Sequence, residues 1–466
     1  MEKLSRVFEK NLFWGVLGLS VFIPLYPKFP LFNVPGTYVA IRLEDFLIAV
    51  VVVWWFIGKL GKMKGFLNEN ITQAILLFWG IGALSLFSAL VVTNTVVPHL
   101  GFLHYLRRIE FMALFFVASS AFTSFRQIKL WLLTMFAVTI IVVLYGFGQQ
   151  WLNFPVISTT NKEFSKGLIL FLTPDARVNS TFAGHYDLAI YLSFFIILAS
   201  SFFLYFKKML RKIMLMCICG MAFILLTMTA ARISFFAMMG GVTALFWLTN
   251  HKKLILVLAL LGLFAFAVSP ELRHRTVATI TVNLLGGGGA KYTPPPQKEN
   301  PTKHFSIENA VSPSASFSAA PIDVAPGEPL NSTELGVYRS FGIRLDVEWP
   351  RAVRAFEKNP FLGTGYSSLT LATDNDYLRI LGETGLLGFT ALGLVFIIII
   401  KRVWSYIRTS PHNESYYFMC GVFCSLLALF LNGIFIDVLE SSKIAELLWL
   451  TLGAAYASTK FKSYET

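Results

Sequence analysis

The chain has 466 residues, of which 55% are hydrophobic and only 14% are charged, and its mean hydropathy is +0.64. A soluble domain carries about 25% charged residues because its surface meets water, so this composition excludes an ordinary soluble enzyme. It indicates instead a protein whose surface mostly meets lipid. Because the formal net charge of +13 is concentrated in loops, we expect it to attract anionic inner-leaflet lipid and not nucleic acid.

Apolar runs recur along the chain and predict an all-α fold, a polytopic membrane helix bundle with about twelve transmembrane helices and one large outer loop. The runs lie near 12–26, 41–58, 71–92, 109–122, 129–149, 187–206, 213–229, 233–250, 253–269, 386–400, 415–434 and 443–458. They divide the chain into a bundle of nine spans at 1–269, an extracytoplasmic loop at 270–385 and three further spans at 386–466.

Basic residues cluster at both termini and in alternate loops between the runs. Such clusters mark the cytoplasmic side, so the sequence predicts a multi-pass protein of the plasma membrane with both termini cytoplasmic. Arg107 and Arg108 are the main exception, because they come just before the run 109–122 on the opposite side.

The large outer loop changes composition along its length. Residues 286–330 are rich in Gly, Pro, Ser and Ala, which predicts a flexible segment. Residues 332–358 are predicted to be helical, with Ser332 and Thr333 suited to capping the start. Pro350 suits the first position of a short second helix that ends before Asn359.

Arg232 is the clearest functional candidate on the outer side. It lies in Thr-Ala-Ala-Arg between two apolar runs, in a connection too short to be a free loop. A charge at the outer end of a span is costly unless it is used. The plain alternative is an interfacial arginine that reaches the lipid headgroups.

Further polar segments share that side. They are the segment from Arg177 through His185 to a span, Arg344, the sequence from Asn359 through Gly363 to Gly365, and the sequence from Asp374 through Tyr377 to Gly388. Each has a structural alternative: the two glycines suit a turn, Asp374 suits a helix cap, and His185 suits an interfacial position.

The order of these segments resembles the O-antigen ligase/polymerase family. It runs Thr-x-x-Arg, a long outer loop, Arg…Trp…Asn-Pro-x-x-Gly-x-Gly, then Asn-x-Tyr-Leu…Glu-x-Gly-Leu-Leu-Gly. The resemblance is dense from Arg177 to Gly388. It implies a GT-C-like membrane enzyme whose active site lies on the outer face. Such enzymes take a glycan from a polyprenyl-diphosphate-linked donor and transfer it to a hydroxyl of a glycan, lipid or protein acceptor.

The resemblance also implies roles for individual residues. Arg232 and Arg344 match the two arginines expected to bind the diphosphate, and Arg177 is a further candidate. Asp374 stands where ligases place a catalytic histidine, which favours a polymerase or a divergent transferase over a lipid-A-core ligase. The acceptor or structural motif comprises Gly363, Gly365, Asn375, Tyr377 and Glu383, with Leu378 and Gly385 matching the same pattern.

The chemistry calls for these residue types independently of the resemblance. Guanidinium groups are permanently charged and bind phosphate oxygens bidentately, so two arginines can stabilise a departing diphosphate without a metal or another cofactor. The acceptor hydroxyl needs a base, for which Asp374 and His185 are the candidates. Nearby arginines lower the pKa of Asp374 and burial raises it, so its strength as a base depends on which effect is larger.

Other readings of the sequence remain. A transporter or a flippase of lipid-linked glycans would also have many spans and outward arginines, but it needs charges along a path through the membrane. A peptidoglycan glycosyltransferase of the rod-shape and division family shares the architecture, and a non-catalytic relative that has lost its histidine is a third possibility.

Overall fold

The structure is a computed structural model that describes residues 2–35, 40–157, 169–172, 177–269, 273, 276, 344–369 and 373–461. Within these residues the chain is mostly helical, with two short two-stranded pairings. The segment predicted to be flexible at 286–330, and the helix predicted to start near Glu334, lie outside the described residues.

The first half of the chain forms helices joined by short connections. They are α1 (Glu2–Leu25), α2 (Leu43–Lys59), η1 (Leu60–Lys62), α3 (Met63–Leu67), α4 (Asn70–Val91), α5 (Pro98–Ala121) and α6 (Phe125–Trp151). Strands β1 (Pro30–Asn33) and β2 (Ala40–Arg42) pair antiparallel between α1 and α2. Strands β3 (Val156–Ile157) and β4 (Ile169–Leu170) pair in the same way after α6.

The second half continues the bundle. Its helices are α7 (His185–Tyr205), α8 (Met209–Met228), α9 (Arg232–Leu248), α10 (Lys253–Val268), the π-helical turn η4 (Arg344–Glu348), α14 (Trp349–Lys358), α15 (Asp376–Thr409), α16 (Glu414–Asn432) and α17 (Ser442–Ser458). Pro350 occupies the first turn of α14, where its missing N–H is not needed.

The described helices support a membrane protein. Seven helical segments are long and apolar enough to cross a membrane, and Lys10–Leu25, Arg232–Leu248 and Lys253–Val268 are shorter apolar helices. Large apolar side chains are exposed on the outside of the bundle, among them Phe87, Leu133, Leu263 and Ile397. Such a surface is stable when it meets lipid. Each apolar run of the sequence overlaps a helix, but the number of twelve spans stays a prediction.

Two boundaries differ from the sequence prediction. Helix α15 begins at Asp376, ten residues before the predicted span at 386–400, because two helical pieces continue across a kink at Gly385. Arg107 and Arg108 lie inside α5 and not in a loop. Arg108 pairs with Glu440 and donates to the Leu439 carbonyl, and Arg107 lies 3.6 Å from Asp45, so both arginines serve internal ion pairs. Their position therefore does not contradict the predicted orientation.

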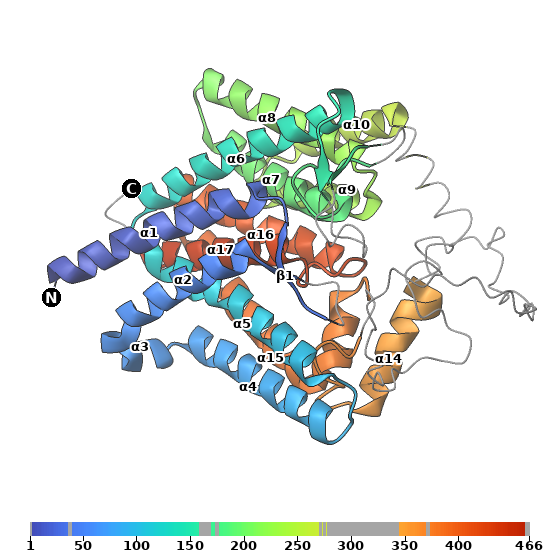
Figure 1. Ribbon diagram of the computed structural model, residues 1–466. Helices are drawn as coiled ribbons and strands as arrows, with labels where there is room; N and C mark the ends of the chain where they lie inside the picture. The colour runs from blue at the N-terminus through green and yellow to red at the C-terminus, as the bar shows by residue number, and fades with distance from the viewer. Residues whose placement is uncertain are drawn as a thin grey trace, which may run out of the picture.

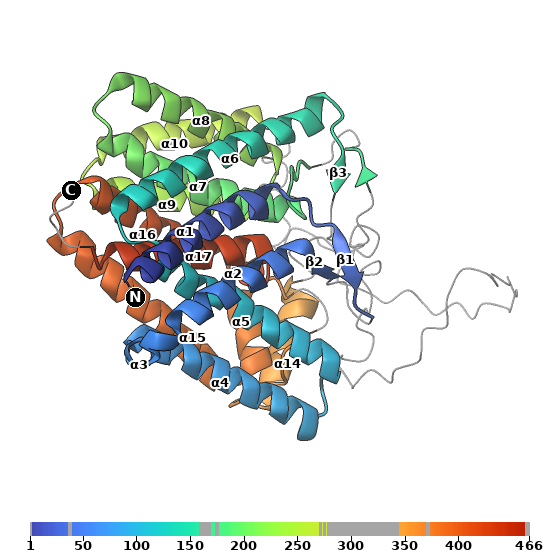
Figure 2. The same cartoon turned by 60° about the vertical axis from the view of Figure 1, so that its left-hand side comes forward.

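The bundle has two distinct ends (Figures 1 and 2). The start of α1 and the end of α17 lie at one end, together with α3. The opposite end carries β1 and α14, and we call it the α14 end. Because successive helices run up and down, α7, α9, α15 and α17 all start at the α14 end. The predicted site residues at these helix starts therefore share one end of the bundle.

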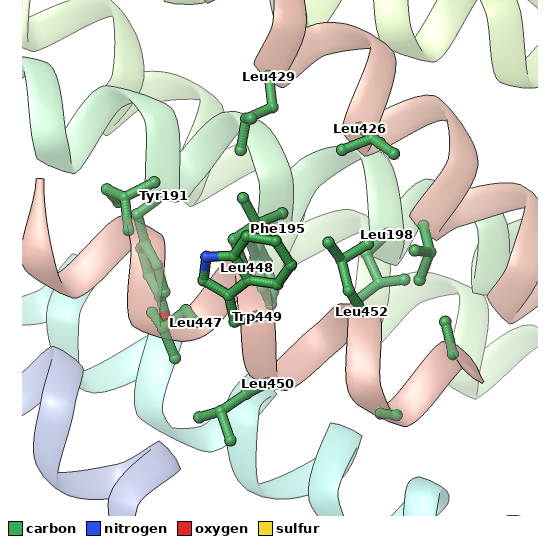
Figure 3. Close-up of a cluster of buried hydrophobic side chains, with 14 of the residues drawn as sticks. Tyr191, Phe195, Leu198, Leu426, Leu429, Leu447, Leu448, Trp449, Leu450 and Leu452 are labelled. Atoms are coloured by element: carbon green, nitrogen blue, oxygen red, sulfur yellow. The ribbon is translucent and has the colours of Figure 1, made fainter. Parts of the chain in front are cut away.

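Helix α17 forms the centre of the bundle, and every residue from Ser442 to Ser458 is buried. Figure 3 shows its leucines and Trp449 packed between α7, through Phe195 and Leu198, and α16, through Leu426. Its two charged residues, Lys443 and Glu446, are also buried. Lys443 donates to the carbonyls of Pro24, Tyr26 and Thr181. The predicted span at 443–458 therefore carries buried charge.

Candidate active site

Arg232 is fixed at the α14 end by a tight turn. It is the first residue of α9, which follows α8 after only three residues. Within that connection Ala230 has a φ of +51°, and the Thr229 hydroxyl accepts a hydrogen bond from the N–H of Ala231 at 3.3 Å. Arg232 therefore stands at the N-terminus of α9, where the first N–H groups of the helix and the helix dipole favour binding of an anion.

Arg344 and Asp374 form an ion pair at the same end. The guanidinium of Arg344 donates from Nε and Nη2 to Oδ2 of Asp374, at 3.0 and 2.6 Å. The Arg344 side chain is 2% exposed, whereas that of Asp374 is 28% exposed. The carboxylate therefore faces outward with the guanidinium behind it, and Oδ1 takes no part in these two bonds.

The environment of Asp374 raises the pKa of its carboxyl group above the ordinary value. Burial is the largest cause, the Arg344 charge opposes it, and the charge of Asp437 adds to it. Burial thus outweighs the arginine, a balance that the sequence left open. A carboxylate with a raised pKa is a better proton acceptor at neutral pH than an ordinary aspartate.

Arg177 and His185 form a second pair. Nη1 of Arg177 donates to Nε2 of His185, the first residue of α7. The His185 ring also contacts Tyr186, with ring centroids 4.1 Å apart. A proton taken up by Nε2 would place two positive charges in contact, which is unfavourable. This geometry favours Asp374 over His185 as the base.

These groups meet around Arg232. The charges of Arg344 and Arg177 both act on Arg232, as does the Tyr186 hydroxyl. We call Arg177, His185, Arg232, Arg344 and Asp374 the arginine cluster. It combines three positive side chains with one outward-facing carboxylate, which is a composition suited to a polyanion and a proton acceptor side by side.

Asp437 holds the backbone on both sides of Asp374. Its Oδ2 accepts from the N–H of Thr373 at 2.9 Å, and its Oδ1 accepts from the N–H of Asn375 at 3.1 Å. Asp374 itself has a φ of +49°, a conformation that costs about 1 kcal/mol for a residue with a side chain. The two hydrogen bonds offset that cost and fix the direction of the Asp374 carboxylate.

Further buried charges tie this loop to the segment between α16 and α17. Arg379 binds Asp437 at 2.7 Å and lies 3.3 Å from Glu440. Asp376 accepts from the backbone N–H groups of Val438 and Leu439 at 3.1 and 3.0 Å. We call Arg108, Asp376, Arg379, Asp437 and Glu440 the support network. Its role in the structure is to position the start of α15.

The predicted acceptor or structural motif makes structural contacts. Asn375 caps α15 by accepting the N–H of Leu378 at 2.9 Å, so the alternative in which Asp374 is the cap is wrong. The Tyr377 hydroxyl donates to the Phe430 carbonyl at 2.9 Å. Asn375 therefore caps α15 and Tyr377 anchors it to α16, and neither is part of the arginine cluster.

The segment that contains Gly363 and Gly365 hydrogen-bonds to backbone groups at the kink in α15. The N–H groups of Thr364 and Gly365 donate to the carbonyls of Gly382 and Glu383, at 2.9 and 2.8 Å. In return, Leu386 donates to the Pro360 carbonyl at 2.8 Å. Gly363 has a φ of +69°, and a Cβ there would lie 2.4 Å from the Glu383 carbonyl carbon. We call this junction of residues 359–365 with 382–387 the seam. It satisfies backbone groups that a broken helix leaves unpaired.

Glu383 belongs to both assemblies. Its backbone carbonyl also accepts from the Ser85 hydroxyl at 2.8 Å, and its buried carboxylate lies 3.5 Å from Arg379. It therefore links the seam to the support network. The structure thus gathers Arg177, His185, Arg232, Arg344 and Asp374 at one place and puts the other predicted residues beneath them.

Comparison with known protein families finds a match for part of the chain. Residues 215–393 match the family model described as O-Antigen ligase. This match supports an O-antigen ligase family assignment. The resemblance read from the motifs is therefore confirmed at the level of the family. Arg232, Arg344 and Asp374 lie within the matched range, whereas Arg177 and His185 precede it. No curated protein matches the chain.

The O-antigen ligase domain and the apolar helices together indicate a membrane glycan ligase-like protein. The family implies a glycosyltransferase-like ligase activity that acts on a lipid-linked glycan and an acceptor. Neither finding assigns a role to an individual residue of the arginine cluster.

The sequence analysis missed several residues that the structure brings to this site. Arg379 is one of them: it stands four residues before the predicted Glu383 on one helix face, a spacing that favours an ion pair. Asp437 and Glu440 come just before the last apolar run, where charges are unusual. Glu348 carried no signal, because its importance depends on what the folded chain packs around it.

Proposed function

We propose that this protein transfers a glycan from a polyprenyl-diphosphate carrier to a hydroxyl of a glycan, lipid or protein acceptor, in the assembly of a surface polysaccharide. The observation that carries the proposal is the arginine cluster, in which the Arg344–Asp374 pair lies beside Arg232 at the N-terminus of α9. A diphosphate needs concentrated positive charge, and the acceptor needs a base close to it.

Each part of the cluster has a role in this reaction. Arg232, Arg344 and Arg177 bind the diphosphate, aided by the N-terminus of α9. The acceptor oxygen attacks the anomeric carbon, and its proton passes to Oδ1 of Asp374. The bond from the anomeric carbon to the diphosphate breaks, and its electron pair stays on the leaving oxygen. The arginines stabilise the charge that develops there, so the reaction proceeds without a metal or another cofactor.

We place the active site on the outer face of the plasma membrane, with both termini cytoplasmic. The alternation of basic loops supports this orientation. The start of α9, which carries Arg232, lies at the opposite end of the bundle from the start of α1 and the end of α17 (Figure 2). The donor and acceptor would therefore meet outside, in contact with the lipid bilayer that holds the polyprenyl chain.

The test of function is transfer by purified protein reconstituted with a polyprenyl-diphosphate glycan and an acceptor. Arg232→Lys and Arg344→Lys should each lower transfer by about tenfold or more, because an ammonium group cannot bind phosphate bidentately. Arg408→Lys, at an exposed position near the far end of α15, is the matched control. Full activity of both cluster variants would mean that these arginines are interfacial anchors. Movement of the donor across the bilayer without a new glycosidic bond would support a flippase instead.

The test of orientation is thiol labelling in intact cells, using a variant that lacks the four native cysteines. Glu357→Cys, exposed on α14, should react with a membrane-impermeant reagent, and Lys64→Cys, exposed on α3, should not. The reverse pattern would overturn the proposed orientation.

A further inference from the structure

Glu348 is a buried carboxylic acid on the same π-helical turn as Arg344. It follows Arg344 by four residues and ends η4, immediately before α14. The residue is 8% exposed, and within the described residues its Oε2 has no hydrogen-bond partner. π-helical turns are rare and occur often at functional sites. The position of Glu348 against the proposed diphosphate site therefore calls for an explanation.

The charges of four groups act on Glu348. They are Arg344 on its own turn, Asp374 on the loop before α15, Asp437 on the segment before α17, and Arg351 on α14. Arg344 gives two hydrogen bonds to Asp374, and Asp437 is bonded to Arg379 and to two backbone N–H groups. Arg344 thus acts on two carboxyl groups, and it already donates two hydrogen bonds to one of them, that of Asp374.

An ionised Glu348 would be costly in this position. A buried charge that lacks a full set of partners costs several kcal/mol, and a group in that position takes up a proton instead. The local electrostatics agree: burial, with the charge of Asp374 added and that of Arg344 opposed, raises the pKa of Glu348 to about 9. At neutral pH the side chain is then a neutral acid.

We propose that Glu348 is a positioning residue that stays protonated and thereby reserves Arg344 for a second anion, the diphosphate of the donor. The inference rests on the proposed function. With Glu348 neutral, Asp374 is the negative partner that Arg344 binds within the described residues, and Nη1 of Arg344 takes no part in those two bonds. Ionisation of Glu348 would add a negative charge beside Arg344 and repel the diphosphate.

The consequence is a specific dependence of donor binding on pH. As pH rises through the pKa of Glu348, the acid loses its proton and the affinity for the diphosphate falls. We expect the Kd for a polyprenyl diphosphate, and the KM for the glycan donor, to rise about tenfold between about pH 8 and about pH 10. The value of kcat should change less, because the bound complex keeps the acid protonated.

The decisive variant is Glu348→Gln, which has the shape of the neutral acid but cannot ionise. Its Kd for farnesyl diphosphate at pH 7 should stay within about twofold of wild type, and it should remain flat up to about pH 10. Glu357→Gln, which removes an exposed carboxylate from α14, should keep the wild-type profile. Thermal denaturation of all three proteins checks that the fold is intact.

Two results would overturn the inference. One is an alkaline rise in Kd that persists in Glu348→Gln, and the other is a tenfold weaker binding by this variant at pH 7. If Glu348→Gln does not fold, a wild-type Kd that does not change across the same pH range would also overturn the inference. Failure of the proposed function is distinguishable, because wild type would then bind no farnesyl diphosphate even at pH 7.

Discussion

Two arginine–aspartate pairs lie close together at the start of α15, and they differ in what surrounds them. In the Arg344–Asp374 pair the carboxylate is 28% exposed and receives two hydrogen bonds from one guanidinium. In the Arg379–Asp437 pair the two side chains are 10% and 11% exposed. The Asp437 carboxylate also receives two backbone N–H groups.

The difference separates a functional pair from a scaffolding pair. Both oxygens of Asp437 accept hydrogen bonds from the protein itself, and removing one partner of a buried ion pair is destabilising. Asp374 keeps one oxygen out of the ion pair and faces outward. An arginine–aspartate pair can therefore act on substrate when its carboxylate is exposed, as in Arg344–Asp374, and hold a loop in place when it is buried, as in Arg379–Asp437.

The largest effect should follow from replacing the exposed carboxylate. Asp374→Asn should lower the transfer rate by about 10²–10⁴-fold, because it removes the proposed base. Thermal denaturation should show a folded protein. His185→Gln in the same assay is the comparison, and it should cost less. Near-normal turnover by Asp374→Asn would transfer the role of base to His185, and near-normal turnover by both would leave the proton with solvent.

Replacing the buried carboxylate should act on stability instead. Asp437→Asn removes the nearest charged partner of Arg379, at 2.7 Å, while Glu440 and Glu383 remain at 3.3 and 3.5 Å, so we expect a cost of about 1–3 kcal/mol. The free energy of unfolding, measured with denaturant in detergent, should fall by that amount. A stable Asp437→Asn protein that only loses activity would remove the distinction between the two pairs.

The seam beneath the pairs offers a smaller, sharper test. Gly385 has a φ of +66°, and a Cβ there would lie 2.3 Å from the Phe361 carbonyl oxygen. Gly385→Ala should therefore destabilise the protein by about 1–3 kcal/mol. Gly393→Ala, in the same helix at a position where a Cβ would meet no atom within 4 Å, should be neutral or stabilising by up to about 1 kcal/mol. Equal effects of both changes on the free energy of unfolding would mean that the seam tolerates a side chain.

The pH profile should show the smallest effect. Burial raises the pKa of Asp374, so the carboxylate form that accepts a proton is present above that pKa and is lost as pH falls through it. The rate should fall about tenfold per pH unit on the acid side, beginning at a higher pH than an ordinary aspartate would give. The residual activity of Asp374→Asn should lack this acid limb, and its persistence there would assign the limb to another group.

Sequence reasoning recovered the helices and the ordered motifs better than the contacts. Apolar runs indicate helices directly, and the order of the motifs that contain Arg232, Arg344 and Tyr377 pointed to one family. The residues of the motif around Tyr377 were found, but their use as anchors was not. The support network escaped because Asp437 and Asp376 act through partners far away in sequence. The pKa of Asp374 depends on opposing effects whose sizes only the packed structure gives.

The central position of α17 has a consequence for how the protein is made. This helix is the last one in the described chain and all of its residues are buried, so it is synthesised after every described helix that it packs against. The segment that holds Asp374 in place is synthesised just before it. A chain truncated before Ser442 would therefore lack the centre of the bundle, and not only an edge of it.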